Sequence, residues 1–178
     1  MTTKTRTIWR KEDIQRKIDR ALECLTKSDA YLIKAGANER SITHMLATYL
    51  ADEFPELHVD CEYNRMWRDG DEMKKKVVLP VGMSHNISVF DTEASTVFPD
   101  IIVHRRENSD RNLLVVEAKK SSNSDRQLDF KKLDGFMAEK NEGGREYDFS
   151  AFIIFDVENP EKSSAEVKEV GENWSHEN

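Results

Sequence analysis

The sequence predicts a mixed α/β protein in which helices flank a mixed sheet. Three observations lead to this fold class. Apolar residues recur at helical spacing in the first third of the chain, short apolar runs follow later, and a helical segment separates the last two runs. The expected order is helix, helix, two or three strands, strand, helix, strand. A mostly antiparallel start is thus followed by a strand–helix–strand unit.

Two amphipathic helices are expected before the first strand. The spacing of Ile14, Ile18, Leu22 and Leu25 predicts a helix over roughly residues 10–26. The stretch "SDAYLIKAGA" looks like a short helical connector, and Asn38 is a plausible N-cap for the next helix. The apolar stripe of that helix consists of Ile42, Met45, Leu46, Tyr49 and Leu50. "EFPE" ends it.

The first strand is expected in "LHVDCEYNR", where apolar and polar residues alternate. Its apolar face would comprise Leu57, Val59, Cys61 and Tyr63. "RDGDEMKKK" reads as a turn or exposed loop, and "VVLPVGMSHNISVF" as one interrupted strand or irregular connection. The runs IIV and LLVV within "FPDIIVHRRENSDRNLLVVEAKKSS" then predict two neighbouring strands, joined by a polar turn near Asn108 to Asp110.

A helix and a last strand complete the predicted sheet. "SNSDRQLDFKKLDGFMAEK" is helical in pattern, with Ser124 and Gln127 in capping-box register. Its buried side would consist of Leu133, Phe136 and Met137. "DFSAFIIFDV" predicts a largely buried strand. We expect the polar segment after Glu158 to fray, with a short helix near "SSAEVKEV".

Length and composition indicate one soluble domain of 178 residues. We divide it into an N-terminal helical extension (1–37), a core (38–157) and a polar acidic tail (158–178). The start of the chain lacks the apolar region of a signal peptide, and no run approaches membrane-spanning length. Cys24 and Cys61 form neither a metal pair nor a disulfide framework, so we interpret them as buried thiols in a reducing cytoplasm.

The charge distribution is compatible with a polyanionic partner. The net charge of −7 argues against one at first, but the tail after residue 157 carries six glutamates and two lysines. The remaining body is therefore closer to neutral, and it contains several basic pairs and one triplet. A solvated surface is the simpler interpretation of each basic group taken alone.

Charged residues stand at the ends of the two neighbouring apolar strands. Asp100 follows Pro99 at the start of the first, while Glu117 and Lys119 end the second. Strand periodicity places Leu113, Val115, Glu117 and Lys119 on one face, and Leu114, Val116 and Ala118 on the other. If the strands form a hairpin, counting outward from the expected turn puts Asp100 roughly opposite Glu117.

Two converging carboxylates repel each other unless a cation joins them or one is protonated. Mg²⁺ is typically held by one or two carboxylates and keeps waters for a phosphate substrate. Lys119 could then orient the attacking water or neutralise developing charge. The alternative is structural: Glu117 and Lys119 form an edge ion pair, and Asp100 is only a strand-start residue.

The pattern "PD" at 99–100 followed by "EAK" at 117–119, each with an apolar strand, resembles the PD-(D/E)XK nuclease superfamily. This resemblance implies a restriction-endonuclease-like αβββαβ core, which the segments from residue 38 to residue 157 match in order. It therefore covers about two thirds of the chain.

The resemblance also implies roles for individual residues. Asp100 and Glu117 would be ligands of Mg²⁺ or Mn²⁺, Lys119 would be the catalytic lysine, and the Ala118 carbonyl would be a further ligand. Members of the superfamily often place a glutamate on the first core helix, and Glu39 is the matching candidate. A first-turn glutamate stabilised by the helix dipole is an equally good interpretation of Glu39.

Nucleic-acid contacts are expected from the lysine triplet in the loop before the interrupted strand, and from lysines near these strand ends. We assign this role to Lys74, Lys75, Lys76, Lys120 and Lys132. The resulting hypothesis is a metal-dependent nuclease that hydrolyses phosphodiesters, with DNA expected before RNA, acting as a homodimer or within a larger complex. The alternatives are a catalytically inactive module of the same fold and an unrelated α+β protein that binds a basic partner.

Overall fold

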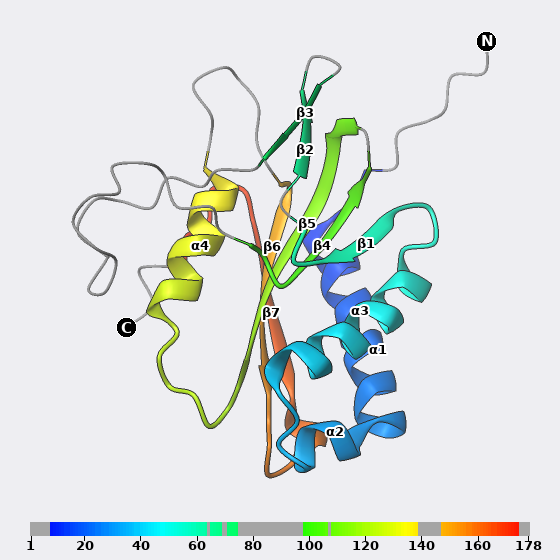
Figure 1. Ribbon diagram of the computed structural model, residues 1–178, viewed down its shortest axis with the longest axis vertical. Coiled ribbons are helices and arrows are strands. Elements are labelled where there is room, and N and C mark those ends of the chain that lie inside the picture. The colour runs from blue at the N-terminus through cyan, green and yellow to red at the C-terminus, as the bar shows by residue number, and fades with distance from the viewer. Residues whose placement is uncertain are drawn as a thin grey trace.

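The computed structural model describes residues 8–63, 65–68, 71–74, 98–106, 108–138 and 147–174 (Figure 1). The helices are α1 (Lys11–Ser28), α2 (Ala30–Lys34), α3 (Glu39–Glu53), α4 (Gln127–Met137) and the short 3₁₀ helix η1 (Pro160–Lys162). The strands are β1 (His58–Cys61), β2 (Arg65–Arg68), β3 (Asp71–Lys74), β4 (Ile101–Arg105), β5 (Asn108–Lys120), β6 (Phe149–Phe155) and β7 (Ser164–Glu169).

Five strands form one mixed sheet in the order β1-β4-β5-β6-β7. The central pair, β5 and β6, is parallel, and the other neighbours are antiparallel. Helix α4 connects the parallel pair and lies on one face of the sheet, while α1 and α3 lie on the opposite face (Figure 1). The predicted fold class, a mixed sheet between helices, is confirmed.

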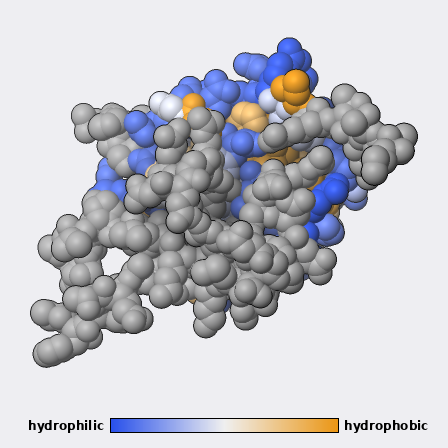
Figure 2. Space-filling model, turned by 90° about the horizontal axis from the view of Figure 1, so that it is seen from above, coloured by the Kyte–Doolittle hydropathy of each residue, from blue (hydrophilic) through white to orange (hydrophobic). Residues whose placement is uncertain are grey.

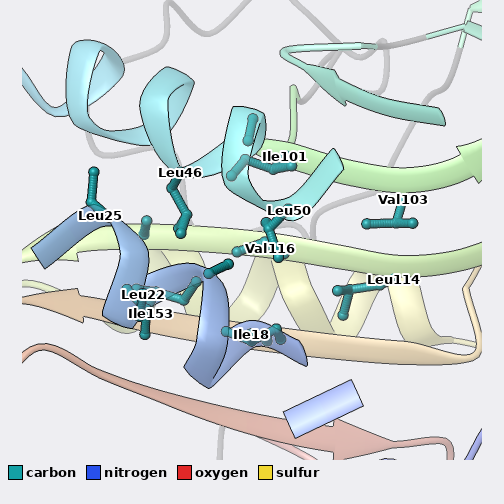
Figure 3. Packing of buried hydrophobic residues seen from close by; sticks show 14 of the residues in the cluster. Ile18, Leu22, Leu25, Leu46, Leu50, Ile101, Val103, Leu114, Val116 and Ile153 are labelled. Atoms are coloured by element: carbon teal, nitrogen blue, oxygen red, sulfur yellow. The ribbon is translucent and has the colours of Figure 1, made fainter. Parts of the chain in front are cut away.

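The first two predicted helices are confirmed, and both pack into the main core. The buried side of α1 includes Ile18, Leu22 and Leu25, which point towards α3 and the sheet (Figure 3). Asn38 caps α3, since its side chain accepts a hydrogen bond of 2.7 Å from the Ser41 backbone N–H. The segment before residue 38 therefore contributes apolar surface to the same core as the sheet.

The alternation predicted for the first strand ends at Glu62. This residue has a φ of 49°, in the left-handed region, directly after β1. The turn in the backbone reverses the side chain that follows. Tyr63 therefore packs against the buried apolar residues between the sheet and α4, and its ring lies 4.8 Å from that of His104 between centroids. Val59 packs instead on the opposite face of the sheet, which α1 and α3 cover. The prediction that Tyr63 shares a face with Val59 was wrong for this reason.

The segment predicted as a turn or loop after the first strand is a separate two-stranded sheet. Strands β2 and β3 pair antiparallel, with Arg68 opposite Asp71. Lys74 is the last residue of β3. Lys75, Lys76 and the segment "VVLPVGMSHNISVF" lie outside the described residues.

Strands β4 and β5 form the predicted antiparallel hairpin, but the turn lies earlier than expected. Arg105 pairs with Asn108, so residues 108–110 belong to β5 instead of forming the turn. A regular ladder continued from this pair would bring Asp100 opposite Leu113.

Irregularities in the hairpin change this register. The pairing shifts on both sides of His104, which leaves additional residues in β5. Beyond these shifts Ile101 pairs with Val116. One residue further along the ladder, Asp100 faces Glu117, as the sequence predicted.

The same irregularities reverse one side chain of β5. Leu113 and Leu114 both pack among the buried residues on the face that α1 and α3 cover, while Val115 packs among those between the sheet and α4. The prediction that Leu113 and Val115 share a face was wrong, because strand periodicity is interrupted between the two parts of β5.

Helix α4 starts later than its capping-box pattern predicted. Its first residue is Gln127 and its N-cap is Arg126, without a side-chain cap, so Ser124 does not cap it. The predicted apolar side of the helix is confirmed by the burial of Leu133, Phe136 and Met137.

The segment after residue 157 is ordered into the sheet. Strand β7 pairs with β6, where a fraying tail or a short helix was expected, and that expectation was wrong. Trp174 is fully buried against Phe130 and Phe152, and its Nε1 donates a hydrogen bond of 2.9 Å to Ser150 Oγ. The polar composition concealed this strand, although Val167 packs in the core that includes α1 and the adjacent Lys168 is buried with its ammonium over the Trp174 ring.

The coloured surface seen from above is largely hydrophilic (Figure 2). Large apolar side chains that remain exposed among the described residues are Ile8, Tyr31, Phe98 and Leu128. Cys24 is exposed as well and Cys61 is only partly buried, so the prediction that both thiols are buried was wrong. No helix in the described part of the chain has both the length and the apolar character needed to cross a membrane.

Candidate functional site

Asp100 and Glu117 meet at one end of the sheet. Asp100 precedes β4 and Glu117 lies in β5, opposite each other, so both side chains are on the face covered by α4. Asp100 Oδ2 accepts a hydrogen bond of 2.8 Å from the Ala118 backbone N–H. The two predicted carboxylates are therefore brought together by the hairpin register.

Glu117 is a buried carboxylate with incomplete hydrogen bonding. Its side chain is only 1% exposed. Oε2 accepts a hydrogen bond of 3.0 Å from Lys132 Nζ, while Oε1 has no hydrogen-bond partner among the residues that the structure describes. A buried polar atom without a partner costs free energy, so this oxygen is a candidate position for a ligand.

Burial raises the pKa of Glu117 well above its usual range, and the nearby charge of Asp100 raises it further. The pKa of Asp100 is also raised, chiefly by burial, although the Ala118 N–H partly offsets this effect. Ionising both groups without a compensating cation is therefore unfavourable. This electrostatic conflict is what the sequence pattern predicted for two carboxylates that converge.

Lys119 lies at the same end of the sheet but contacts other acids. Its Nζ is 3.3 Å from Asp129 Oδ2 and 3.8 Å from Glu39 Oε1. Burial lowers the pKa of Lys119, yet the carboxylates of Asp129 and Glu39 outweigh burial and leave the pKa raised. Lys119 is thus held as an ammonium beside the acidic pair.

Asp129 is the site residue that sequence reasoning missed. It lies in the first turn of α4 with a side chain only 4% exposed, and its Oδ1 is 3.3 Å from Lys132 Nζ. A signal was present in the sequence. Asp129, Leu133 and Phe136 follow the i, i+4, i+7 spacing of one helix face, so a carboxylate falls on an apolar stripe.

Glu39 enters the site from the other side of the sheet. As the first residue of α3 it reaches the end of β5, where its Oε2 accepts a hydrogen bond of 3.0 Å from the Lys120 backbone N–H. Because β4 begins at Ile101, it does not extend alongside Lys120. The carboxylates of Asp100 and Glu39 therefore satisfy backbone donors of β5 that a neighbouring strand would otherwise pair.

We call these six side chains the carboxylate–lysine cluster: Glu39, Asp100, Glu117, Asp129, Lys119 and Lys132. Four acids against two lysines give the cluster a formal charge of −2 when every member is ionised. A divalent cation would offset this excess of negative charge.

The other predicted site residues occupy different positions. The Ala118 carbonyl shares the strand edge of its N–H, so it points to the side where Asp100 lies. Lys120 Nζ donates a hydrogen bond of 3.1 Å to the Gly36 carbonyl, away from the acidic pair. Lys132, expected to contact phosphate, is engaged by Glu117 and Asp129 instead of standing on an open surface.

The cluster fits a hard divalent cation that relies on water or substrate for part of its coordination. The described residues contain no group of three or more His, Cys, Asp or Glu side chains arranged to hold a metal by themselves. Two carboxylates, Asp100 and Glu117, with the Ala118 carbonyl beside them, are nevertheless the donor types and number that Mg²⁺ ordinarily takes from a protein.

No family model, curated protein or solved structure matches this chain.

Proposed function

We propose that this protein is a metal-dependent nuclease that hydrolyses phosphodiester bonds, with DNA as the first substrate to test. The observation that carries the proposal is Glu117, a fully buried carboxylate that faces Asp100 and has a free Oε1 among the described residues. A buried oxygen without a hydrogen-bond partner lowers the stability of the fold unless a ligand binds to it.

Each residue of the cluster has a distinct part in this proposal. Asp100 and Glu117 would hold Mg²⁺ or Mn²⁺, with the Ala118 carbonyl as a further ligand. When bound, the ion would polarise the phosphodiester and lower the pKa of a water. Lys119 would orient the attacking water and stabilise negative charge on the phosphorus oxygens, because Asp129 and Glu39 keep it charged.

The element order supports the same proposal. Helix α3, strands β1, β4 and β5, helix α4 and strand β6 follow the αβββαβ order of the superfamily that the "PD" and "EAK" motifs resemble, once the separate β2–β3 hairpin between β1 and β4 is set aside. The cluster also lies at the carboxyl end of β5, beside its parallel neighbour β6, where α/β sheets commonly bind ligands. Homodimer formation and a cytoplasmic location stay predictions.

A catalytically inactive module that binds nucleic acid or a protein is the second candidate. One observation favours it. Asp100 and Glu39 each accept a hydrogen bond from a backbone N–H of β5, so these acids also stabilise the end of the strand. Acids with this structural role could persist without any chemistry at the site.

The test is hydrolysis of labelled single- and double-stranded DNA and RNA in the presence of Mg²⁺ or Mn²⁺. Wild-type protein should cut at least one substrate, and a chelator should abolish the activity. Lys119→Met should reduce kcat by about a hundredfold or more without loss of fold, since it removes charge stabilisation of the transition state.

Lys131→Met is the matched control, because Lys131 carries the same charge on the neighbouring helix α4 and makes no ion pair with the cluster among the described residues. Retained hydrolysis in Lys119→Met would contradict the catalytic role. Metal binding without hydrolysis of any substrate would favour the inactive module.

A further inference from the structure

We propose that Lys132 is the built-in counter-ion of the site and competes with the divalent cation for Glu117. The inference rests on the proposed function, because it concerns the metal affinity of the same cluster. It assigns Lys132 a role in setting that affinity, in place of the phosphate contact expected from the sequence.

The contacts of Lys132 carry this inference. Its Nζ lies 3.0 Å from Glu117 Oε2 and 3.3 Å from Asp129 Oδ1. Within the described part of the chain, Lys132 is the lysine or arginine that forms an ion pair with Glu117. In the metal-free protein the ammonium of Lys132 thus neutralises the buried carboxylate of Glu117.

The two lysines of the cluster contact different acids. Lys119 lies near Asp129 and Glu39, whereas Lys132 lies near Glu117 and Asp129. Asp129 is therefore shared, with one oxygen directed to each lysine, and it separates two ammonium groups that would otherwise repel. Lys119 can remain in place when Glu117 takes a cation, but Lys132 would then face an added positive charge.

The position of Lys132 on α4 allows its ammonium to leave Glu117 without moving the helix. Helix α4 is anchored by the burial of Leu133 and Phe136, next to Lys132 in the same helix. The Lys132 side chain is 20% exposed, so part of it already reaches solvent. A long lysine stem can redirect its charged end towards water at small cost.

The experiment compares Mn²⁺ binding by wild type and Lys132→Gln, using isothermal titration calorimetry. A pH of about 8.5 is chosen because few protons then compete with Mn²⁺ for the carboxylates. Glutamine keeps a hydrogen-bond donor for Glu117 and removes the charge. We expect Mn²⁺ to bind at least about tenfold more tightly to Lys132→Gln, because removing a neighbouring like charge favours the bound cation. The Tm of the metal-free variant should fall.

Lys131→Gln is the matched control and should bind Mn²⁺ like wild type. An unchanged or weaker affinity of Lys132→Gln, with metal binding intact in wild type, would overturn the counter-ion role and leave the proposed function standing. Absence of Mn²⁺ binding by wild type would remove both.

Lys132→Met, which keeps the apolar stem, covers the case in which Lys132→Gln fails to fold without metal. Mn²⁺ should then restore folding of these variants, as followed by circular dichroism, because the ion replaces the missing charge. Variants that stay unfolded at saturating Mn²⁺ would contradict the proposal.

Discussion

The ammonium of Lys119 lies 3.3 Å from the buried carboxylate of Asp129, so the position of a strand lysine depends on a residue of helix α4. The other oxygen of Asp129 lies 3.3 Å from Lys132. One helix residue thus connects both lysines of the cluster, and its removal affects stability as well as the site.

Asp129→Asn should lower the free energy of unfolding by about 2 kcal/mol, because both lysines lose a charge-assisted contact to their shared anion while each keeps one other acid, Glu39 or Glu117. Urea denaturation of the metal-free protein measures this change. Asp125→Asn, an exposed change just before the same helix, should have little effect. Equal stability of Asp129→Asn and wild type would show that the contacts of Asp129 contribute no net stability.

Adding millimolar Mg²⁺ or Mn²⁺ should raise the Tm of the wild-type protein, because the ion binds the folded site. Asp100→Asn should abolish this rise. The asparagine oxygen can still accept the hydrogen bond from the Ala118 N–H, so the strand end should persist. Differential scanning fluorimetry with and without metal provides the measurement. A metal-dependent rise that survives in Asp100→Asn would place the ion elsewhere.

Glu117 should make the stability of the metal-free protein depend on pH. Because the pKa of Glu117 is raised in the folded state, its contribution is complete below the unfolded pKa and is lost as pH rises through the folded pKa. The stability of Glu117→Gln relative to wild type should therefore increase from about pH 5 to pH 8.

Urea denaturation across this pH range gives the difference between wild type and Glu117→Gln. Glu158→Gln, at an exposed position, is the control for the same substitution outside the cluster. A constant difference for Glu117→Gln would indicate that burial does not disfavour its ionised form.

Trp174 should be a major stabilising contact of the C-terminal segment. Trp174→Ala should lower the free energy of unfolding by about 3 to 5 kcal/mol, since it leaves a large cavity between α4 and the sheet. Trp174→Phe should cost less, because the ring packing against Phe130 remains and mainly the hydrogen bond to Ser150 is lost. Thermal unfolding measures both. Near-equal effects of the two variants would assign the stabilisation to the hydrogen bond.

Local sequence determined most of the individual elements. Apolar spacing located α1 and α3, Asn38 marked the cap of α3, and continuous apolar runs located β4 and β6. These features depend on residues within a few positions of one another, so a single sequence contains their physical cause. The acids at 100 and 117 could also be recognised there, because charge at the end of an apolar strand is unusual.

Side-chain direction was predicted less well wherever the backbone departed from regular strand geometry. The left-handed conformation of Glu62 reversed Tyr63, and the register shifts around His104 reversed Leu113. Both predictions assumed that side chains alternate strictly between the two faces of a strand. An added residue or a positive φ breaks this alternation and is not visible in the apolar pattern.

What the sequence by itself determined about this protein was the set of helices and strands, and the presence of acids and a lysine at strand ends. The tertiary structure alone decided that Asp129 and Lys132 join them. These residues come from a helix that follows β5 in the chain, and they reach Glu117 and Lys119 only when α4 packs back across the sheet. Charge balance in a buried cluster depends on such distances, and no spacing along the chain specifies them.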